Sequence, residues 1–480
     1  MLREGGNEVR LVSRLNSDVV YSFIYLDSIE LDYQRSYQAA NGELIFANAD
    51  YESITVQGFS GSNVLALDIT NPNKPLRLRT LPGKNEAGEY TITILTKPEH
   101  NYFITENIGL TVSGDITVDS PSQLHSGDNY ADYLMISPLN MMASAQRLAD
   151  YRAAQGMTAT VIDIEDIQDE FSHSLAAPEA VHEFLTYVYE NWATPPRYVV
   201  LIGDGSYDYK DYLGYGYPVV PTELVATTDG FFPSDNRFAD VVGDDGIPEF
   251  AIGRIPVVNS LELDQYVDKL ISYEQASYGG NSVLNLVTDR ADSKAGDFLA
   301  SADKVAELMP RSVSVNFLDA GSLGNSGAHS GVAAALRQGG GIMHYVGHSS
   351  LVAFGRRSSL LTASEIESMS DTGSPMLMVS MACSTASFGY PPMRSIGEAA
   401  VLRADGVAAG FFGATGLSKN YLADIMAEGF YRGLLDPANL GVGDAVVEAK
   451  CDYAAQGLSN DLLYIYNFLG DPAMSVPIQH

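Results

Sequence analysis

From Tyr130 onward, short apolar segments alternate with longer segments in which apolar residues have helical spacing. Tyr133–Ile136 and Thr158–Ile162 are predicted strands, and Ala143–Gln155, between them, is a predicted helix that ends at Gly156. Strands that alternate with helices in this way form a mostly parallel sheet with helices on both faces. The pattern therefore predicts an α/β fold for the larger part of the chain.

The same alternation continues to the C-terminal region, in two blocks that share the scheme but no repeated sequence. The further predicted strands are Arg197–Ile202, Glu249–Ile255, Val283–Thr288, Val313–Phe317, Ile342–Val346, Met376–Met381 and Val407–Phe412. The further predicted helices are Pro178–Trp192, Leu261–Ala276, Phe298–Met309, His329–Arg337, Ile396–Arg403, Tyr421–Leu435 and Val442–Ala455.

The N-terminal quarter has a different pattern. Short segments of alternating polarity, such as Ser53–Val56 and Glu89–Leu95, are separated by turn signals such as Asn41-Gly42, and no helical period persists. This predicts a β-sandwich-like domain. We therefore expect a β-rich domain over residues 1–122, an α/β subdomain over 123–278 and a second, catalytic α/β subdomain over 279–480.

Composition limits the classes of partner. The 480 residues include 28 Lys and Arg against 60 Asp and Glu, a net charge of −32, which argues against nucleic acid and anionic membranes. The charge suits basic substrates and Ca²⁺. The sequence has no run of about 18 apolar residues, so no membrane-spanning helix is predicted. The N-terminus lacks the apolar stretch of a signal peptide. The chain is expected to be either cytosolic or part of a longer secreted protein.

Reactive side chains follow the buried strands of the second α/β block. Asp289 follows the first of these strands, His348 lies two residues after another, and Cys383 lies two residues after the next. Because ligands bind at the carboxyl ends of strands in open α/β sheets, these residues are expected at one edge of one sheet. An acid, an imidazole and a thiol at one edge predict nucleophilic catalysis.

The chemistry explains why these types belong together. A thiol near its free pKa is only slightly ionised and needs a base, which imidazole supplies, while a carboxylate orients the imidazole. Each residue also has a structural interpretation: a cysteine after an apolar strand as core packing, and an aspartate at a strand end as turn chemistry. His344 is interpreted as a core residue and Cys451 as structural. A disulfide between Cys383 and Cys451 would remove the reactive thiolate.

Several motifs together resemble the gingipain-type, caspase-like cysteine peptidases. Gly347-His348-Ser349-Ser350 is similar to that family's Gly-His-Gly-Ser, and Met381-Ala382-Cys383 is similar to its strand-end nucleophile. Further similar segments occur in family order, covering roughly residues 130–480: Val200-Leu201-Ile202-Gly203-Asp204, Ser234-Asp235, Pro248–Arg254, Tyr273-Glu274 and Phe468-Leu469-Gly470-Asp471-Pro472. Residues 1–120 resemble the β-domain that precedes the peptidase in many secreted members.

The resemblance implies cleavage of protein or peptide substrates through a thioester, with Cys383 as nucleophile and His348 as base. The third catalytic residue falls at Asp289, with Asp292 as the fallback. The backbone N–H groups of Ser349 and Cys383 are the implied oxyanion donors. Because the family usually has Gly at the position of Ser349, the left-handed φ that Gly permits would be costly here. The resemblance also implies a secreted or cell-surface location.

Two further sites are implied only by the resemblance. A structural Ca²⁺ site maps to the carboxylates of Asp245 and Glu249 and the carbonyls of Val242 and Ile247, a set of oxygens that suits a hard cation. The alternative is a solvated acidic turn. Asp297 maps to the acid that lines the pocket for the side chain before the cut bond and would favour Arg or Lys, whereas Gly296-Asp297 also has the pattern of a helix N-cap.

Three functions remain open at this point. The first is a cysteine endopeptidase, possibly one that cuts after basic residues. The second is a weak or inactive binding or scaffold module that retains the fold. The third is a transpeptidase, similar in its chemistry to sortases, that passes the acyl group to an amine. Labelling of Cys383 by an activity-based probe separates the second function from the others, and product analysis separates the third.

Overall fold

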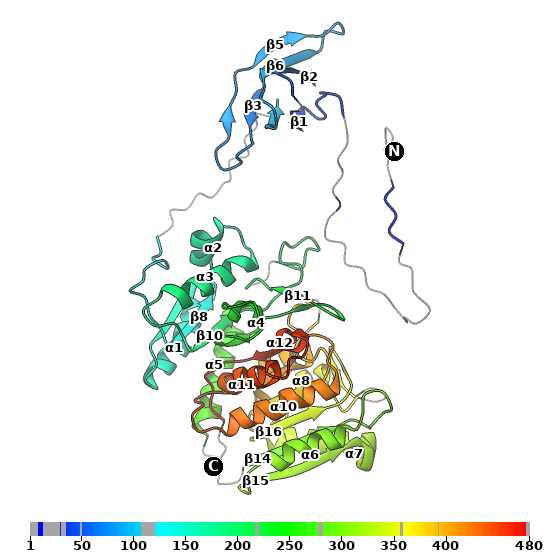
Figure 1. The fold of residues 1–480 in the computed structure, drawn as a ribbon. Helices are drawn as coiled ribbons and strands as arrows, with labels where there is room; N and C mark the ends of the chain where they lie inside the picture. Colours follow the sequence, from blue (N-terminus) through cyan, green and yellow to red (C-terminus); the bar gives the residue numbers. More distant parts are fainter. Residues whose placement is uncertain are drawn as a thin grey trace. The chain divides into compact units, whose positions relative to one another are not determined.

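The computed structural model describes residues 8–12, 29, 35–48, 50–106, 121–216, 220–276, 282–355, 359–391 and 393–476 (Figure 1). The chain forms two compact units, residues 1–120 and residues 121–480. The boundary expected between the two α/β subdomains, at 278 and 279, lies outside the described residues. Within the described ranges, no helix has both the length and the apolar character that crossing a membrane requires.

The N-terminal unit is built from two antiparallel sheets around one core, as the alternating pattern predicts. One sheet has the strand order β1-β7-β3-β4 and the other β2-β6-β5. Buried residues of both sheets, such as Leu44 and Val56, meet in a single cluster, which makes the unit sandwich-like. The strands are β1 (Glu43–Ala47), β2 (Ser53–Phe59), β3 (Leu65–Asp68), β4 (Leu76–Arg77), β5 (Leu81–Lys84), β6 (Tyr90–Leu95) and β7 (Asn101–Thr105).

The second unit contains a ten-stranded sheet with the order β15-β14-β16-β20-β21-β22-β13-β10-β8-β9. Neighbouring strands run parallel within the block on each side of β22. Strand β22 pairs antiparallel with β21, and its single pair with β13, Leu469 with Arg254, is parallel. The sheet confirms the predicted α/β class. Its strands are β8 (Tyr133–Ser137), β9 (Ala159–Asp163), β10 (Tyr198–Ile202), β13 (Ala251–Ile255), β14 (Ser282–Thr288), β15 (Val313–Asp319), β16 (Ile342–Val346), β20 (Met376–Met381), β21 (Ala408–Ala414) and β22 (Tyr466–Leu469).

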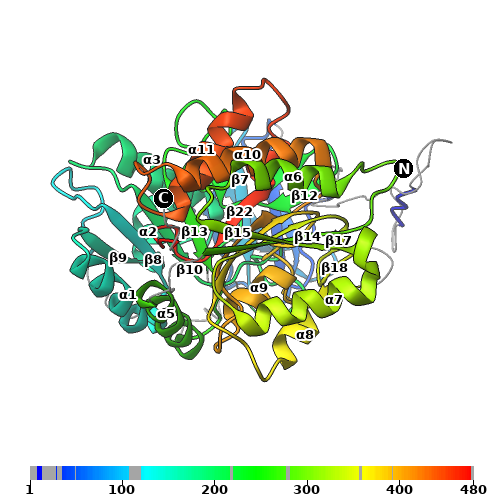
Figure 2. The same cartoon turned by 90° about the horizontal axis from the view of Figure 1, so that it is seen from below.

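Helices cover both faces of this sheet, so its central strands are buried throughout. Figure 2 shows α6, α10 and α11 on one face and α1, α5, α7, α8 and α9 on the other. The helices are α1 (Met142–Ala154), α2 (Ile164–Ser172), α3 (Pro178–Asn191), α4 (Asn236–Ala239), α5 (Ser260–Gln275), α6 (Phe298–Leu308), α7 (Ala320–Gln338), α8 (Ala363–Ser368), α9 (Ile396–Leu402), α10 (Asn420–Leu435), α11 (Val442–Ala454) and α12 (Asp461–Ile465). A short 3₁₀ turn, Leu139–Met141, precedes α1.

Small strands and hairpins complete the unit near the carboxyl ends of the large sheet. They are β11 (Leu224–Thr227), β12 (Gly230–Pro233), β17 (Ser349–Ser350), β18 (Ala353–Phe354) and β19 (Leu361–Thr362). The segments that follow β10 and β13 lie against the segment that follows β20. Arg394, just before α9, pairs with Glu262 in the first turn of α5, and the backbone of Gly389 accepts a hydrogen bond from Tyr207.

The predicted elements differ from the observed ones in a few places. Helix α7 starts at Ala320, nine residues before the predicted start, because Asp319 caps it. Its first turns have only one large apolar residue, Leu323, so no helical period shows there. The helix has a kink at Gly324, where φ is 71°. Strand β13 starts at Ala251 rather than Glu249, because the Glu249 carboxylate accepts hydrogen bonds from two loop amides. Helix α2 and strand β22 were not predicted as elements.

A buried charge cluster joins distant parts of the unit. Arg152 at the end of α1 donates to Asp471 and Glu274, with nearest N···O distances of 2.7 and 2.9 Å, and all three side chains are almost fully buried. Burial lowers the pKa of Arg152, but the charges of Asp471 and Glu274 more than offset this and raise it. The cluster therefore fixes α1 and α5 to the segment that follows β22.

This cluster gives a testable stability prediction. Arg152→Met leaves two buried carboxylates without a cation and should lower the free energy of unfolding by about 3–5 kcal/mol in denaturant titration. Arg147→Met is the matched control, because Arg147 lies on the same helix and also pairs with two acids of α5, but in an exposed position. The control should cost about 1 kcal/mol or less. Equal losses in the two variants would contradict the role of the buried cluster.

Candidate active site

The three strand ends that carry the predicted reactive residues lie side by side. Strand β16 pairs with β14 on one side and with β20 on the other, and Val346 is level with both Thr288 and Met381. Asp289, His348 and Cys383 follow these strands within one to two residues. The parallel pairing therefore brings the predicted acid, imidazole and thiol to one edge of the sheet.

The imidazole of His348 is held by an acid. Its Nε2 atom lies 2.5 Å from Oδ2 of Asp292, and its ring packs edge-on against Phe298 at a centroid distance of 5.4 Å. The other oxygen of Asp292 accepts hydrogen bonds from the backbone N–H groups of Lys294 and Ala295. These amides and His348 hold the pKa of Asp292 well below its ordinary value. The carboxylate is thus ionised and can orient an imidazole and stabilise its charged form.

The acid bonded to His348 is thus the fallback residue rather than the one first expected. Asp289 is buried, and its Oδ1 accepts the N–H of Arg290 at 2.7 Å. Its Cβ lies so close to Gly347 that a side chain at Gly347 would clash with it. Asp292 reaches His348 because residues 292–296 close a turn, in which Asp292 and Gly296 exchange backbone hydrogen bonds.

The thiol of Cys383 is half-buried and contacts Ser418. The sulfur donates to the carbonyl of Ser418 and accepts from its N–H, both at 3.4 Å. Burial raises the pKa of Cys383, the Ser418 N–H lowers it, and the negative charge of Asp229 raises it, with a net increase. Among the described residues no hydrogen bond joins this thiol to His348. The resting thiol is therefore largely protonated.

Asp229 and Ser418 are site residues that sequence reasoning missed. Asp229 lies in the turn between β11 and β12, and its carboxylate has no hydrogen-bond or ion-pair partner among the described residues. The Asp229-Gly230 pair is a hairpin signal, but nothing in the sequence places this hairpin beside Cys383. Ser418 lies four residues after the end of β21, and no sequence signal marks it.

Ser349 ties the two reactive loops together. Its hydroxyl donates to the carbonyl of Cys383 at 2.6 Å, a bond that Gly could not make. Ser349 does not have a positive φ, so the backbone cost expected for replacing Gly is absent. Gly355 donates to the carbonyl of His348, which makes Ser349 and Phe354 a non-hydrogen-bonded pair of β17 and β18. The Ser349 N–H therefore points away from β18.

Backbone strain lies instead at Ser384, directly after the nucleophile. Its φ is 56°, a left-handed conformation that costs a non-glycine residue on the order of 1–3 kcal/mol. Its N–H donates to the carbonyl of Gly416 at 2.8 Å, which holds the strained residue in place. The strained turn thus orients the backbone around the thiol.

None of the other predicted side chains bonds the thiol among the described residues. Asp297 is exposed and caps α6, accepting hydrogen bonds from the N–H groups of Leu299 and Ala300. His344 is fully buried, and burial lowers its pKa to about 3. Cys451 is exposed on α11, and both cysteines are free thiols. Asp297 is thus the cap that its sequence pattern allowed, and its role in substrate selection stays a prediction.

The predicted metal-binding loop lies between α4 and β13. Glu249 accepts from the N–H groups of Val241 and Val242, and Asp245 accepts from that of Ile247. Burial raises the pKa of Glu249, and the charges of Asp240 and Asp245 raise it further. No group of three or more His, Cys, Asp or Glu side chains suited to a metal occurs in the described part of the chain. A cation here would need the two carboxylates together with backbone carbonyls.

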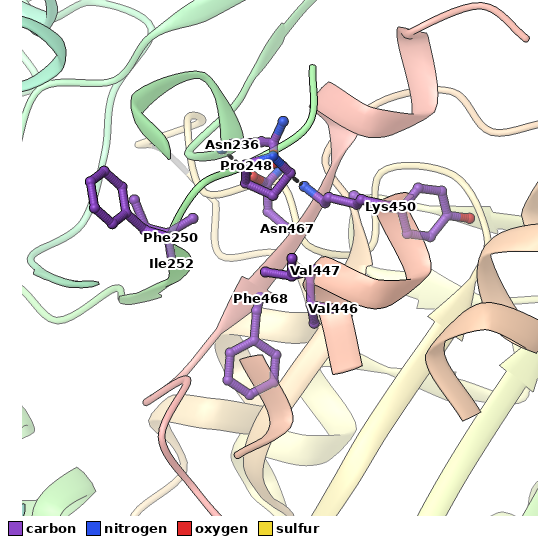
Figure 3. A pocket seen from close by; sticks show the side chains of 10 residues that line it. Asn236, Pro248, Phe250, Ile252, Val446, Val447, Lys450, Asn467 and Phe468 are labelled. Atoms are coloured by element: carbon purple, nitrogen blue, oxygen red, sulfur yellow. Dashed lines mark hydrogen bonds between the residues drawn. The ribbon is translucent and has the colours of Figure 1, made fainter. Parts of the chain in front are cut away.

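A small cavity beside this loop is closed to substrates. Figure 3 shows Lys450 pointing toward Asn236, and the ammonium donates to Asn236 and to the carbonyl of Leu463. Burial lowers the pKa of Lys450 to about 7. The cavity volume is about 10 Å³, barely the space of one water molecule.

A mostly parallel sheet with a thiol and an acid-held imidazole at neighbouring strand ends defines the class of caspase-like cysteine peptidases. Residues 126–477 match the model of peptidase family C25, and the chain belongs to that family. This confirms the gingipain-type resemblance. No curated protein sequence matches the chain.

Solved structures show the same fold at low sequence identity. The complex of the pro- and mature domains of RgpB from Porphyromonas gingivalis aligns with a TM-score of 0.60 and 17% identity, over 72% of this chain and 79% of that one. The Arg-specific cysteine proteinase gingipain R (RgpB) gives the same TM-score and identity, over 75% and 80%. A third structure, described as a protease, gives a TM-score of 0.58 and 16% identity, over 72% and 78%.

Proposed function

We propose that this protein is an endopeptidase in which Cys383 attacks the peptide bond and His348 transfers the protons. The observation that carries the proposal is the hydrogen bond of His348 to Asp292 beside the strand end that carries Cys383. Membership of family C25 supports the reaction class, and protein or peptide chains are the corresponding substrates.

The arrangement suggests a role for each group. Asp292 occupies Nε2 of His348, which leaves Nδ1 to accept the proton of the thiol. The thiolate then adds to the carbonyl carbon, and His348 returns the proton to the leaving amine as the peptide bond breaks. Water, deprotonated by His348, then hydrolyses the resulting thioester and frees Cys383. The N–H groups of Ser349 and Cys383 are the proposed donors to the oxyanion.

The resting contacts imply a step before chemistry. The Cys383 sulfur bonds Ser418 in the free protein, so substrate must shift the thiol from Ser418 toward His348. Catalytic hydrogen bonds commonly tighten only when substrate is bound. The same contacts favour the second candidate function, a weak or inactive binding module, because a protonated thiol that never reaches the imidazole would not react.

We further propose that basic side chains are preferred at the cut. One of the similar structures is an Arg-specific cysteine proteinase, and two carboxylates here are candidates for such a preference. Asp297, next to Phe298, is the residue expected from the family, but it is an exposed cap. Asp229 has no partner among the described residues and its charge acts on the thiol. A cation bound at Asp229 would also lower the pKa of Cys383.

The proposal predicts the outcome of a hydrolysis assay. Peptides with Arg or Lys before the cut should be cleaved faster than peptides with Leu or Asp, and Cys383→Ala and His348→Ala should abolish cleavage. Asp229→Asn should reduce the preference for Arg about tenfold or more, because an ion pair desolvated at an active site is worth more than a surface pair. Cys451→Ala is the control and should retain full activity.

The variants separate the possibilities. Loss of the Arg preference in Asp297→Ala but not in Asp229→Asn would assign selection to the cap residue. Hydrolysis that survives Cys383→Ala would contradict the proposed nucleophile. A folded wild-type protein that binds peptides but cleaves none would establish the inactive module.

We also propose that the loop of residues 242–249 binds a structural Ca²⁺. Its predicted ligands are Asp245, Glu249 and the carbonyls of Val242 and Ile247, and the raised pKa of Glu249 supports the idea because a cation would relieve the repulsion. Buried Asp240 adds a carboxylate oxygen, Oδ1, that has no hydrogen-bond partner in the part of the chain that the structure describes. A secreted or cell-surface location, by contrast, stays a prediction of the family resemblance.

Calcium binding should be visible as a stability change. Millimolar Ca²⁺ should raise the Tm of chelator-treated protein by several degrees, and Asp245→Ala should erase the gain. The gain should shrink as the pH falls through the raised pKa of Glu249, since protonated carboxyls do not bind Ca²⁺. Asp244→Ala is the matched control, because Asp244 lies in the same loop but pairs with Arg237. An unchanged Tm in wild type would argue against the site.

A further inference from the structure

Three tyrosines, two of them exposed and one half-buried, form a cluster beside the segment that follows Cys383. The ring of Tyr207 stacks on that of Tyr390 at a centroid distance of 5.7 Å, and the Tyr207 side chain hydrogen-bonds to Tyr215. Tyr215 is 50% exposed and Tyr390 is 43% exposed. Exposed aromatic groups of this kind mark interaction sites, because their faces offer apolar contact area at little cost in conformational entropy. We call these three residues the tyrosine cluster.

The loop that presents the cluster is ordered by its own carboxylates. The two oxygens of Asp208 accept the N–H groups of Tyr212 and Leu213, and Asp211 accepts that of Gly216. These acids are therefore used inside the loop. The cluster offers ring faces rather than free negative charge.

The tyrosine cluster is continuous with the segment that leaves the nucleophile. Tyr390 lies seven residues after Cys383, and the carbonyl of the preceding Gly389 accepts the N–H of Tyr207 at 2.9 Å. The ring of Phe388 packs against Gly205, where an added Cβ would lie 2.9 Å from it. The segment after Cys383 thus runs along the carboxyl edge of the sheet from the thiol to the cluster.

The spacing of the strands gives the distance between the two sites. Cys383 follows β20 and Tyr207 follows β10, and these strands are four positions apart in the sheet. At about 4.8 Å per strand the separation is about 19 Å, which an extended peptide spans with about six residues. A substrate chain bound at Cys383 can therefore reach the cluster.

We propose that the tyrosine cluster is an exosite that holds an aromatic or aliphatic side chain of the substrate polypeptide, about six residues from the bond that is cut. This inference rests on the proposed peptidase function. The occupant is a peptide because the cluster is built on the nucleophile's own segment, and its side chain is apolar because the cluster presents uncharged rings.

The experiment compares peptides that share one cut sequence. Four-residue peptides cover the cut alone, and fourteen-residue peptides carry either Trp or Ser six residues from the cut, on one side or the other. On one side, Trp should raise kcat/KM about 3- to 10-fold over Ser, mainly through a lower KM, the size expected for one aromatic contact. Hydrolysis of the four-residue peptides should not depend on the cluster.

Variants test whether the cluster is responsible. Tyr390→Ala and Tyr215→Ala should each remove most of the gain from Trp and leave the four-residue peptides unaffected. Tyr212→Ala is the matched control, because Tyr212 lies in the same loop, is 82% exposed and has no ring partner among the described residues. The control should keep the gain.

Several results would overturn the exosite. One is an equal kcat/KM for the Trp and Ser peptides on both sides of the cut, and another is a gain from Trp that survives Tyr390→Ala. A third is a loss of kcat/KM in Tyr390→Ala that is equally large for the four-residue peptides. The last is inhibition of hydrolysis by oligosaccharides, with no effect of the peptide side chain. Failure of the peptidase proposal itself has a different signature, the absence of Cys383-dependent cleavage of any peptide. In that event, anisotropy of a labelled fourteen-residue peptide on Cys383→Ala still tests the cluster: tighter binding of Trp than Ser supports it, and equal binding overturns it.

Discussion

Strand β22 joins the two α/β blocks into one sheet. It pairs antiparallel with β21 from Phe411 to Ala414, and on its other side Leu469 meets Arg254 of β13. Without it, β21 and β13 would both present an unpaired edge in the middle of the unit. The ion pair of Asp471 with Arg152, immediately after the strand, anchors it to the helix layer. The fold of residues 121–480 thus depends on this short strand.

The same strand reaches the candidate active site. At its start, the hydroxyl of Tyr466 lies 2.8 Å from that of Ser418, and the carbonyl of Ile465 accepts the N–H of Thr415. Ser418 in turn holds the sulfur of Cys383. The resting position of the thiol is therefore set by packing between β21 and β22 and not by the imidazole. Substrate must therefore move the Cys383 sulfur away from Ser418 and toward His348. Until that happens, the thiol of the free protein is a poor nucleophile.

Much of the fold was predictable because it depends on local pattern. Apolar runs with turn residues at their ends give β16 and β20 at the predicted bounds, and parallel pairing then places His348 beside Cys383. Strand β22 was missed because its four residues are too short for a period to show. The sequence favours Asp289 as the acid for His348, because strand ends can be located from the apolar pattern. The acid that bonds His348 is Asp292, and the turn that brings it to the imidazole depends on backbone contacts within a loop. Asp229 and Ser418 come from other parts of the chain, and only the folded structure brings them to the thiol.

The central claim is that the thiol of Cys383 is protonated at rest and loses its proton to His348 when a peptide is bound. The most direct measurement compares, at pH 7, the rate at which Cys383 is modified by a peptidyl acyloxymethyl ketone and by iodoacetamide, with the site identified by mass spectrometry. The account predicts that the peptide reagent modifies Cys383 fast and that His348→Ala slows this reaction by orders of magnitude. It also predicts that iodoacetamide alkylates Cys383 slowly, with a rate that rises only above the ordinary pKa of a cysteine. Equal rates for the two reagents, or a rate that His348→Ala leaves unchanged, would contradict it.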